Sequence, residues 1–139
     1  MTARARRFEF AVEQARDGDI TGDRGGSALA GAEQKQWTPE HLLLAGLARC
    51  SLTSLAFHAK RAGISTISAA KASGAVTQRE SDGRFAFVEI TVDADVTLDP
   101  APTDDDLDVL LQNAERDCFV GASLSLKPTY NWTVNGRQR

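Results

Sequence analysis

The sequence contains two cysteines, Cys50 and Cys118, and a pair of thiols is able to carry out redox chemistry. A thiolate can be oxidised to a sulfenic acid, and a second thiol can then condense with it to form a disulfide. The alternative is that both cysteines are packing residues, because a free cysteine is among the most buried residue types and behaves as a small hydrophobic group. The residue types alone leave both interpretations open.

A reactive thiolate at Cys50 needs a cation beside it. We expect Cys50 to lie well inside an apolar helix, where burial raises the pKa of a thiol and the helix dipole gives little help. Arg24, in a glycine-rich loop, is the first candidate, and Arg7, on a predicted strand, is the second. Arg49 is adjacent in sequence but points about 100° away around the helix. Glu40 is the carboxylate nearest the helix entrance and is able to hold such an arginine.

The two histidines do not point to a metal site. His41 and His58, together with the cysteines, could suggest zinc, but neither Cys-x-x-Cys nor His-x-x-x-His spacing occurs. The simplest interpretation places His41 in the first turn of a helix and His58 in its last turn. We predict neither a metal nor a bound cofactor.

The segment that carries Cys50 predicts one long helix. Thr38 can cap its free amides, Pro39 suits its first position, and Gly63 supplies a left-handed end. At 1.5 Å per residue, such a helix is roughly 36 Å long. Its apolar side chains cover more than one face, so it must be covered on more than one side; they are Leu42, Leu43, Leu44, Leu47, Leu52, Leu55 and Phe57.

Alternating apolar and polar residues predict the strands around this helix. Residues 7–13 indicate a half-buried strand, residues 88–98 give the strongest strand pattern, and residues 128–134 form a closing strand. Small residues between 67 and 79, followed by Asp82-Gly83, predict a hairpin.

A second helix is expected to begin at Thr103, with aspartates in its first turn, and to carry Cys118 on its core face. The order of elements predicts a single α+β domain over residues 1–139, in which a curved antiparallel sheet wraps a long central helix.

Composition and charge exclude several classes of partner. The net charge of −3 gives no reason to expect nucleic acid or an anionic membrane surface. The basic start is not followed by the apolar run of a signal peptide. Arg49 and His58 interrupt the best candidate for a membrane span. We therefore expect a cytoplasmic protein, in which paired cysteines are more often catalytic, redox-sensing or metal-binding than a lasting disulfide.

Helix geometry keeps Glu40 and Cys50 apart within one chain. In an unbroken helix they are separated by about 15 Å along the axis and by roughly 280° in rotation. Two antiparallel copies of the helix would bring Glu40 of one chain near Cys50 of the other. We therefore predict a homodimer with its sites at the interface.

The helix also resembles a known family. The stretch "TPEHLLLAGLARCSLTSLAFHAKRAGI" is similar to the Pro-Glu-x-Leu-Leu-x-Ala helix of the osmotically induced protein C (OsmC) and organic hydroperoxide resistance (Ohr) proteins, and its Glu40 and Cys50 keep the ten-residue separation of that family. "AERDCFVGASLSL" resembles the second cysteine segment of that family. The resemblance implies an OsmC-like fold, an intertwined homodimer with two equivalent sites at the interface, and a thiol peroxidase that acts on organic hydroperoxides.

The resemblance also implies roles for individual residues. Cys50 would be the thiolate that attacks the peroxide and becomes a sulfenic acid, and Cys118 would resolve it as a disulfide. Glu40 would orient the activating arginine, and an external dithiol of the lipoyl type would regenerate the enzyme. An apolar lining favours bulky alkyl peroxides over hydrogen peroxide; its residues would be Leu43, Leu47 and Phe57.

Two other functions stay open. A non-enzymatic protein of the same fold would use its groove to bind an apolar ligand, or its thiols to sense redox state. A thioesterase of the hot-dog type also wraps a sheet around one long helix, and it would use Glu40 or His41 and neither cysteine.

Overall fold

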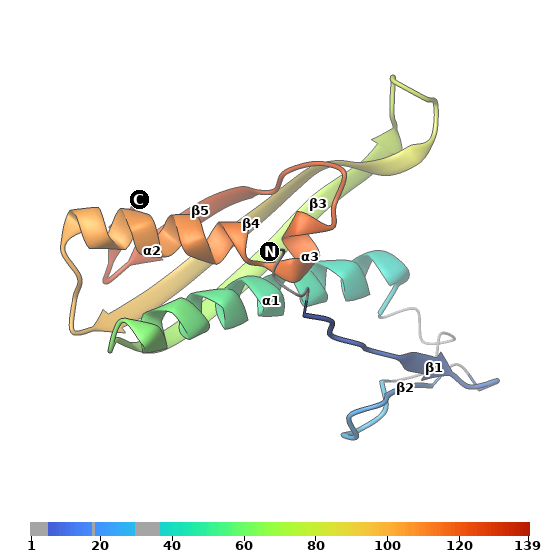
Figure 1. The fold of residues 1–139 in the computed structure, drawn as a ribbon. Coiled ribbons are helices and arrows are strands. Elements are labelled where there is room, and N and C mark those ends of the chain that lie inside the picture. The colour runs from blue at the N-terminus through green and yellow to red at the C-terminus, as the bar shows by residue number, and fades with distance from the viewer. Residues whose placement is uncertain (1–5, 18, 30–36) are drawn as a thin grey trace, which may run out of the picture. The chain divides into compact units, whose positions relative to one another are not determined.

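The computed structural model describes residues 6–17, 19–29 and 37–139 (Figure 1). Contacts divide the chain into two compact units, Met1–Leu42 and Leu43–Arg139. The basic first five residues and the end of the loop before Trp37 lie outside the described residues. The single domain over residues 1–139 stays a prediction.

The described residues of the first unit form one short pair of strands. β1 (Val12–Gln14) and β2 (Ile20–Gly22) pair antiparallel. The prediction of a half-buried strand over residues 7–13 is wrong, because the strand begins only at Val12 and the side chains of Phe8, Phe10 and Val12 are exposed. A pair of three-residue strands is too small to bury one of its own faces.

Helix α1 (Pro39–Arg61) has the predicted ends. The Thr38 hydroxyl accepts a hydrogen bond of 3.2 Å from the His41 backbone N–H, and Gly63 ends the helix with φ of 75°. By length and composition alone, α1 meets the criterion for a membrane-crossing helix, which core helices of soluble proteins also meet. Its buried residues are Leu47, Ser51, Ser54, Leu55 and Ala59.

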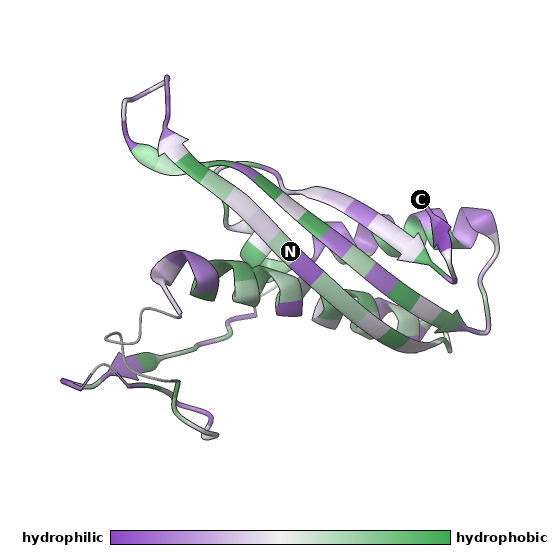
Figure 2. Cartoon of the chain, turned by 180° about the vertical axis from the view of Figure 1, so that it is seen from behind, coloured by the Kyte–Doolittle hydropathy of each residue, from purple (hydrophilic) through white to green (hydrophobic). Residues whose placement is uncertain are grey.

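The second unit contains a sheet of four strands in the order β3-β4-β5-β6. Strands β3 (Ser65–Gln78) and β4 (Phe85–Asp99) form the predicted hairpin, and Gly83 in its turn has φ of 71°. Hydrophobic and hydrophilic residues alternate along β4 (Figure 2). Its apolar side chains at alternate positions from Ile90 to Leu98 are buried.

The prediction of an antiparallel sheet is wrong for the closing strand. β5 (Thr129–Val134) pairs parallel with β4, and β6 (Arg137–Gln138) then pairs antiparallel with β5. The chain between β4 and β5 runs back through helices, and such a crossover is the connection that parallel strands require. The curvature of the sheet stays a prediction.

Two helices make that crossover. α2 (Asp104–Arg116) begins as predicted, because the Thr103 side chain accepts a hydrogen bond of 3.2 Å from the Asp106 N–H. α2 ends at Arg116, so the prediction that Cys118 lies on its core face is wrong. Cys118 is instead the extended N-cap residue of the short helix α3 (Phe119–Ala122).

The helices lie on one face of the sheet, as the front and rear views of the second unit show (Figures 1 and 2). One buried cluster joins α1, α2, β4 and β5, with Leu55, Leu107, Val96 and Trp132 among its members. A second, smaller cluster contains Leu47, Ile90, Val92 and Cys118. Cys50 packs against this second cluster, so both cysteine sulfurs lie in this part of the fold.

The hairpin of β3 and β4 is longer than the helix beneath it. Fifteen residues in β4 span about 50 Å at 3.3 Å each, whereas the 23 residues of α1 span about 35 Å. The end of the hairpin therefore projects away from the helices (Figure 1). Phe85, Val76 and Val88 are exposed there.

Candidate active site

The fold brings the two cysteines together. Cys50, from the middle of α1, packs against the cluster that contains Cys118, and the Cys118 thiol lies near enough to raise the pKa of Cys50. Both are free thiols. Cys50 is half-buried, whereas Cys118 is fully buried. An incoming reagent therefore meets Cys50 first.

The start of α3 directs backbone amides at both sulfurs. The backbone N–H groups of Val120 and Phe119 lie near enough to the Cys50 sulfur to lower its pKa. The N–H of Gly121 donates to Cys118 Sγ at 3.4 Å, because Cys118 caps this helix. Amide donors favour the charged form of a thiol.

Burial nevertheless raises the pKa of Cys50. Desolvation is the largest cause, and the neighbouring Cys118 thiol raises this pKa further, while the amide of Val120 and then that of Phe119 lower it. Among the described residues, no cationic side chain contributes to the shift. A thiolate at Cys50 still requires the positive charge that the sequence leads us to expect.

The candidate arginines contact other groups. In the first unit, Arg24 donates to the Glu9 carbonyl oxygen at 3.1 Å and lies over the Phe10 ring, 4.8 Å from its centroid. Arg7 pairs with the Glu9 carboxylate at 2.8 Å. Arg49 is exposed on α1.

The predicted acid and histidines lie on α1. Glu40 is exposed in the first turn. His41 Nδ1 lies 2.7 Å from the Thr38 hydroxyl at the helix start. His58, in the last turn, places Nε2 2.7 Å from Asp117 Oδ2. Within the described ranges, no group of three or more His, Cys, Asp or Glu side chains is placed to hold a metal ion.

The three predicted pocket residues do not lie in one cluster. Leu43 and Leu47 both pack in the cluster with Cys118. Phe57 lies two turns beyond Cys50 and is exposed, with the His58 ring edge-on at 5.2 Å and the Arg61 guanidinium over its face at 5.5 Å.

Two hydroxyl groups that the sequence analysis missed lie beside Cys118. Ser51 Oγ is 3.7 Å from Cys118 Sγ and 3.2 Å from the Tyr130 hydroxyl. Burial, with a smaller effect of the neighbouring Cys118, raises the pKa of Tyr130 to about 12. The alternation of residues 128–134 already placed Tyr130 on the buried face, and a buried phenol usually finds a hydrogen-bond partner. The alternation of residues 128–134 could therefore have identified Tyr130 as a candidate site residue.

Gly121 leaves room for these groups. A Cβ atom at this position would lie 3.2 Å from the Tyr130 hydroxyl and 3.4 Å from Cys118 Sγ. A larger side chain at Gly121 would therefore displace the phenol or the sulfur.

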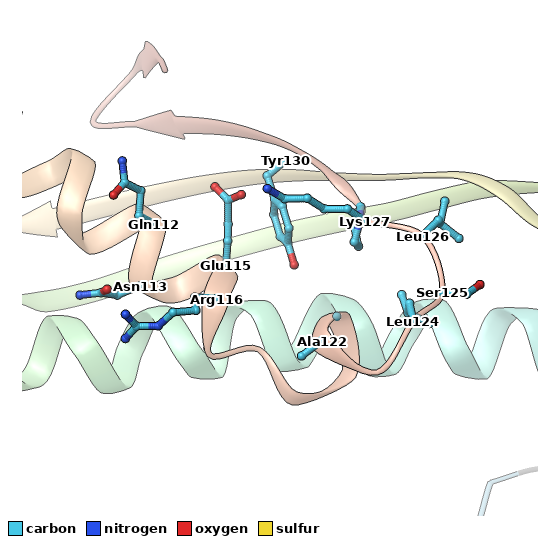
Figure 3. A pocket seen from close by; sticks show the side chains of 12 residues that line it. Gln112, Asn113, Glu115, Arg116, Ala122, Leu124, Ser125, Leu126, Lys127 and Tyr130 are labelled. Atoms are coloured by element: carbon cyan, nitrogen blue, oxygen red, sulfur yellow. The ribbon is translucent and has the colours of Figure 1, made fainter.

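A cavity of about 710 Å³ lies beside Tyr130 (Figure 3) and Gly121. Both residues line it, and the Tyr130 ring points from β5 towards α1 (Figure 3). The predicted pocket residues Leu43, Leu47 and Phe57 are not part of its lining, which otherwise consists of Gln112, Asn113, Glu115, Arg116, Ala122, Leu124, Ser125, Leu126, Lys127 and Pro128.

The sequence model of the OsmC-like protein family matches residues 32–133, which is most of the chain. The chain belongs to the OsmC-like family. This confirms the resemblance seen in the sequence and, with it, an α+β OsmC-like fold. No curated protein sequence matches this OsmC-like protein.

Solved structures share the fold of this OsmC-like protein. An OsmC-like protein from Mycoplasma pneumoniae has a TM-score of 0.69 at 20% identity, over 94% of this chain and 99% of that chain. The organic hydroperoxide resistance protein OhrB of Bacillus subtilis has a TM-score of 0.57 at 23% identity, over 91% and 96%. An organic hydroperoxide resistance protein from Elizabethkingia anophelis has a TM-score of 0.61 at 21% identity, over 94% and 98%.

Proposed function

We propose that this OsmC-like protein is a thiol peroxidase that reduces organic hydroperoxides. The observation that carries the proposal is the contact between a half-buried thiol, Cys50, and a fully buried one, Cys118. Two proteins of the same fold are named organic hydroperoxide resistance proteins, which supports this choice of substrate.

In the first step, the Cys50 thiolate attacks the terminal oxygen of the peroxide. The O–O bond breaks, Cys50 becomes a sulfenic acid, and the alkoxide that leaves takes up a proton to give the alcohol. The amides of Val120 and Phe119 support the thiolate, because both lower the pKa of Cys50. The apolar side chains of Leu43 and Leu47 pack beside the thiols and favour an alkyl peroxide.

In the second step, Cys118 attacks the sulfur of the sulfenic acid. The S–S bond forms, the S–O bond breaks, and hydroxide leaves with the thiol proton as water. An external dithiol of the lipoyl type then reduces the disulfide by thiol–disulfide exchange, and a reducing compartment such as the cytoplasm keeps that dithiol available.

We also propose a homodimer in which each site is completed by a cation. The pKa of Cys50 is raised within a single chain, and a guanidinium beside it would lower this pKa. Arg24, oriented by Glu40, is the proposed source, with Arg7 and Arg49 as the alternatives. A second copy would also cover the apolar side chains of α1 that one chain leaves exposed, such as Phe57.

Counting thiols tests the peroxidase directly. Free thiols are titrated before and after one equivalent of tert-butyl hydroperoxide, and the bridge is mapped by mass spectrometry. We expect both thiols to disappear into a Cys50–Cys118 disulfide and to return on addition of dihydrolipoamide. Thiols that survive the peroxide unchanged would contradict the proposal.

The raised pKa of Cys50 favours a second candidate function. A protonated thiol reacts slowly with peroxide, so the same fold could bind an apolar ligand or respond slowly to redox state. A Cys50→Ser protein that clears cumene hydroperoxide as fast as the wild type would favour this candidate.

A further inference from the structure

Two hydroxyl groups, one buried on Ser51 and one part-buried on Tyr130, form a hydrogen-bonded chain that ends on the Cys118 sulfur. The Tyr130 hydroxyl lies 3.2 Å from Ser51 Oγ, which in turn lies 3.7 Å from Cys118 Sγ. The three groups come from β5, α1 and the N-cap of α3, so only the folded chain brings them together. Ser51 is 1% exposed and Cys118 is 0% exposed, so their contact is shielded from bulk water, whereas the Tyr130 hydroxyl is part-buried and borders the cavity.

We propose that Ser51 and Tyr130 are positioning residues for the second step, in which Cys118 attacks the oxidised Cys50. The proposal rests on the proposed function, because it concerns the second half of that reaction. A serine hydroxyl accepts one hydrogen bond and donates another at the same time. Ser51 can therefore accept from Tyr130 and donate to the sulfur of Cys118.

The surroundings of Tyr130 leave its hydroxyl able to donate to Ser51. Burial raises the pKa of Tyr130 to about 12, so its phenol keeps its proton and remains a donor. The Trp132 ring stacks on Tyr130 with centroids 5.8 Å apart and planes 6° from parallel, and the Trp132 indole N–H is held by Glu115 at 3.1 Å. The stacked rings therefore keep the Tyr130 hydroxyl within hydrogen-bond distance of Ser51.

This arrangement matters most when Cys118 becomes a nucleophile. As its thiol gives up a proton to the departing hydroxide, negative charge develops on the sulfur. The Ser51 hydroxyl and the Gly121 N–H, at 3.4 Å, are both placed to donate to that charge. Hydrogen bonds to a charged group are worth more than those between neutral groups, so the effect belongs to this step.

An aromatic disulfide tests the proposal without any peroxide. When the full-length reduced protein is mixed with dithionitrobenzoate, attack by the Cys50 thiolate releases the first thionitrobenzoate and leaves a mixed disulfide on Cys50. Attack by Cys118 on the Cys50 sulfur then forms the Cys50–Cys118 bond and releases the second. The two absorbance phases thus report the two cysteines separately.

We expect Ser51→Ala to slow the second phase about tenfold and Tyr130→Phe to slow it about threefold, with the first phase within about twofold of wild type. The matched control is Ser54→Ala, since Ser54 lies on the same helix, is also buried, and its hydroxyl has no hydrogen-bond partner among the described residues. That variant should show both phases at the wild-type rate.

A double variant distinguishes the hydrogen-bonded chain from Tyr130 through Ser51 to Cys118 from a general effect on packing. If Tyr130 acts through Ser51, the Ser51→Ala, Tyr130→Phe protein should be no slower in the second phase than Ser51→Ala alone. A wild-type second phase in Ser51→Ala, an equal loss in Ser54→Ala, or multiplied losses in the double variant would overturn the proposal. If Cys50 does not react with peroxide but the variants show the expected second-phase rates, the proposed peroxidase function is refuted. The positioning role of Ser51 and Tyr130 is then still supported.

Discussion

Cys118 is fully buried against Cys50, and the short helix that it caps supplies the amides that face the Cys50 sulfur. One segment of the chain therefore positions the second thiol and the donors for the first. A change in the backbone after Cys118 would disturb both sulfurs together.

Serine in place of either cysteine separates their roles. We expect Cys118→Ser to consume about one equivalent of cumene hydroperoxide and then stop, with Cys50 found as a sulfenic or sulfinic acid by mass spectrometry, because no second thiol is present to form the disulfide. Cys50→Ser should consume none beyond the rate without protein. If the two variants lost activity in the same way at the first equivalent, the assignment of Cys50 as the attacking thiol would be wrong.

The source of the positive charge can be found from the pH dependence of Cys50 alkylation, measured in a Cys118→Ser background. Burial raises the pKa of Cys50, so without a cation the rate should climb about tenfold per pH unit up to alkaline pH. With the proposed arginine in place, the rate should level off at lower pH. We expect Arg24→Ala to move the profile to higher pH, and Arg7→Ala and Arg49→Ala to leave it unchanged. Three profiles identical to that of the parent protein would remove the arginine from the mechanism.

Gly121→Ala should weaken the fold and the thiol site together. The new methyl group would lie 3.2 Å from the Tyr130 hydroxyl and 3.4 Å from Cys118 Sγ, and we expect a loss of about 1–2 kcal/mol in the free energy of unfolding. Gly46→Ala on α1 is the control, since its Cβ would meet nothing within 4 Å in one chain, and it should stabilise by about 0.5–1 kcal/mol. Urea unfolding measures both. Equal effects at the two glycines would show that the close approach at Gly121 is unimportant.

Lowering the pH should remove the contribution of ionised Asp117 to the stability of the folded protein. The Arg116 guanidinium, followed by the bond from His58, lowers the pKa of Asp117 to about 2. Because the folded-state pKa is depressed, the stabilisation is fully present above the unfolded value of about 4 and is lost as the pH falls towards about 2. We expect Asp117→Asn to be less stable than wild type near neutral pH, and the gap between their thermal midpoints to close on acidification. A gap that stays constant down to about pH 2 would contradict this linkage.

Local signals in the sequence predicted much of the fold. The ends of α1 follow from Thr38, Pro39 and Gly63, and the start of α2 follows from Thr103. These residues act on their own neighbours, so a short window of sequence contains the necessary information. The alternation in β4 was equally clear, because one of its faces is buried.

The remaining features depend on contacts between distant parts of the chain. Cys118 fits the helical spacing of the buried residues Leu111 and Ala114, yet the helix stops at Arg116 and the side chain is buried from an extended conformation. The parallel pairing of β5 depends on the path of the crossover and not on any residue within the strand. The contact between Ser51 and Tyr130 spans most of the second unit, and no local pattern encodes it.

Because of the length of the β3–β4 hairpin, we expect its backbone amides to be unevenly protected from hydrogen exchange. Phe85 at the far end is 75% exposed, whereas Ile90, five residues along the same strand, is 2% exposed. In an isolated chain, amide hydrogens near Phe85 should exchange with deuterium long before those near Ile90, because local opening at the tip disturbs little packed surface. If this exchange slows as the protein concentration rises, the degree of slowing would measure how tightly a second copy of the chain binds the exposed end of the hairpin.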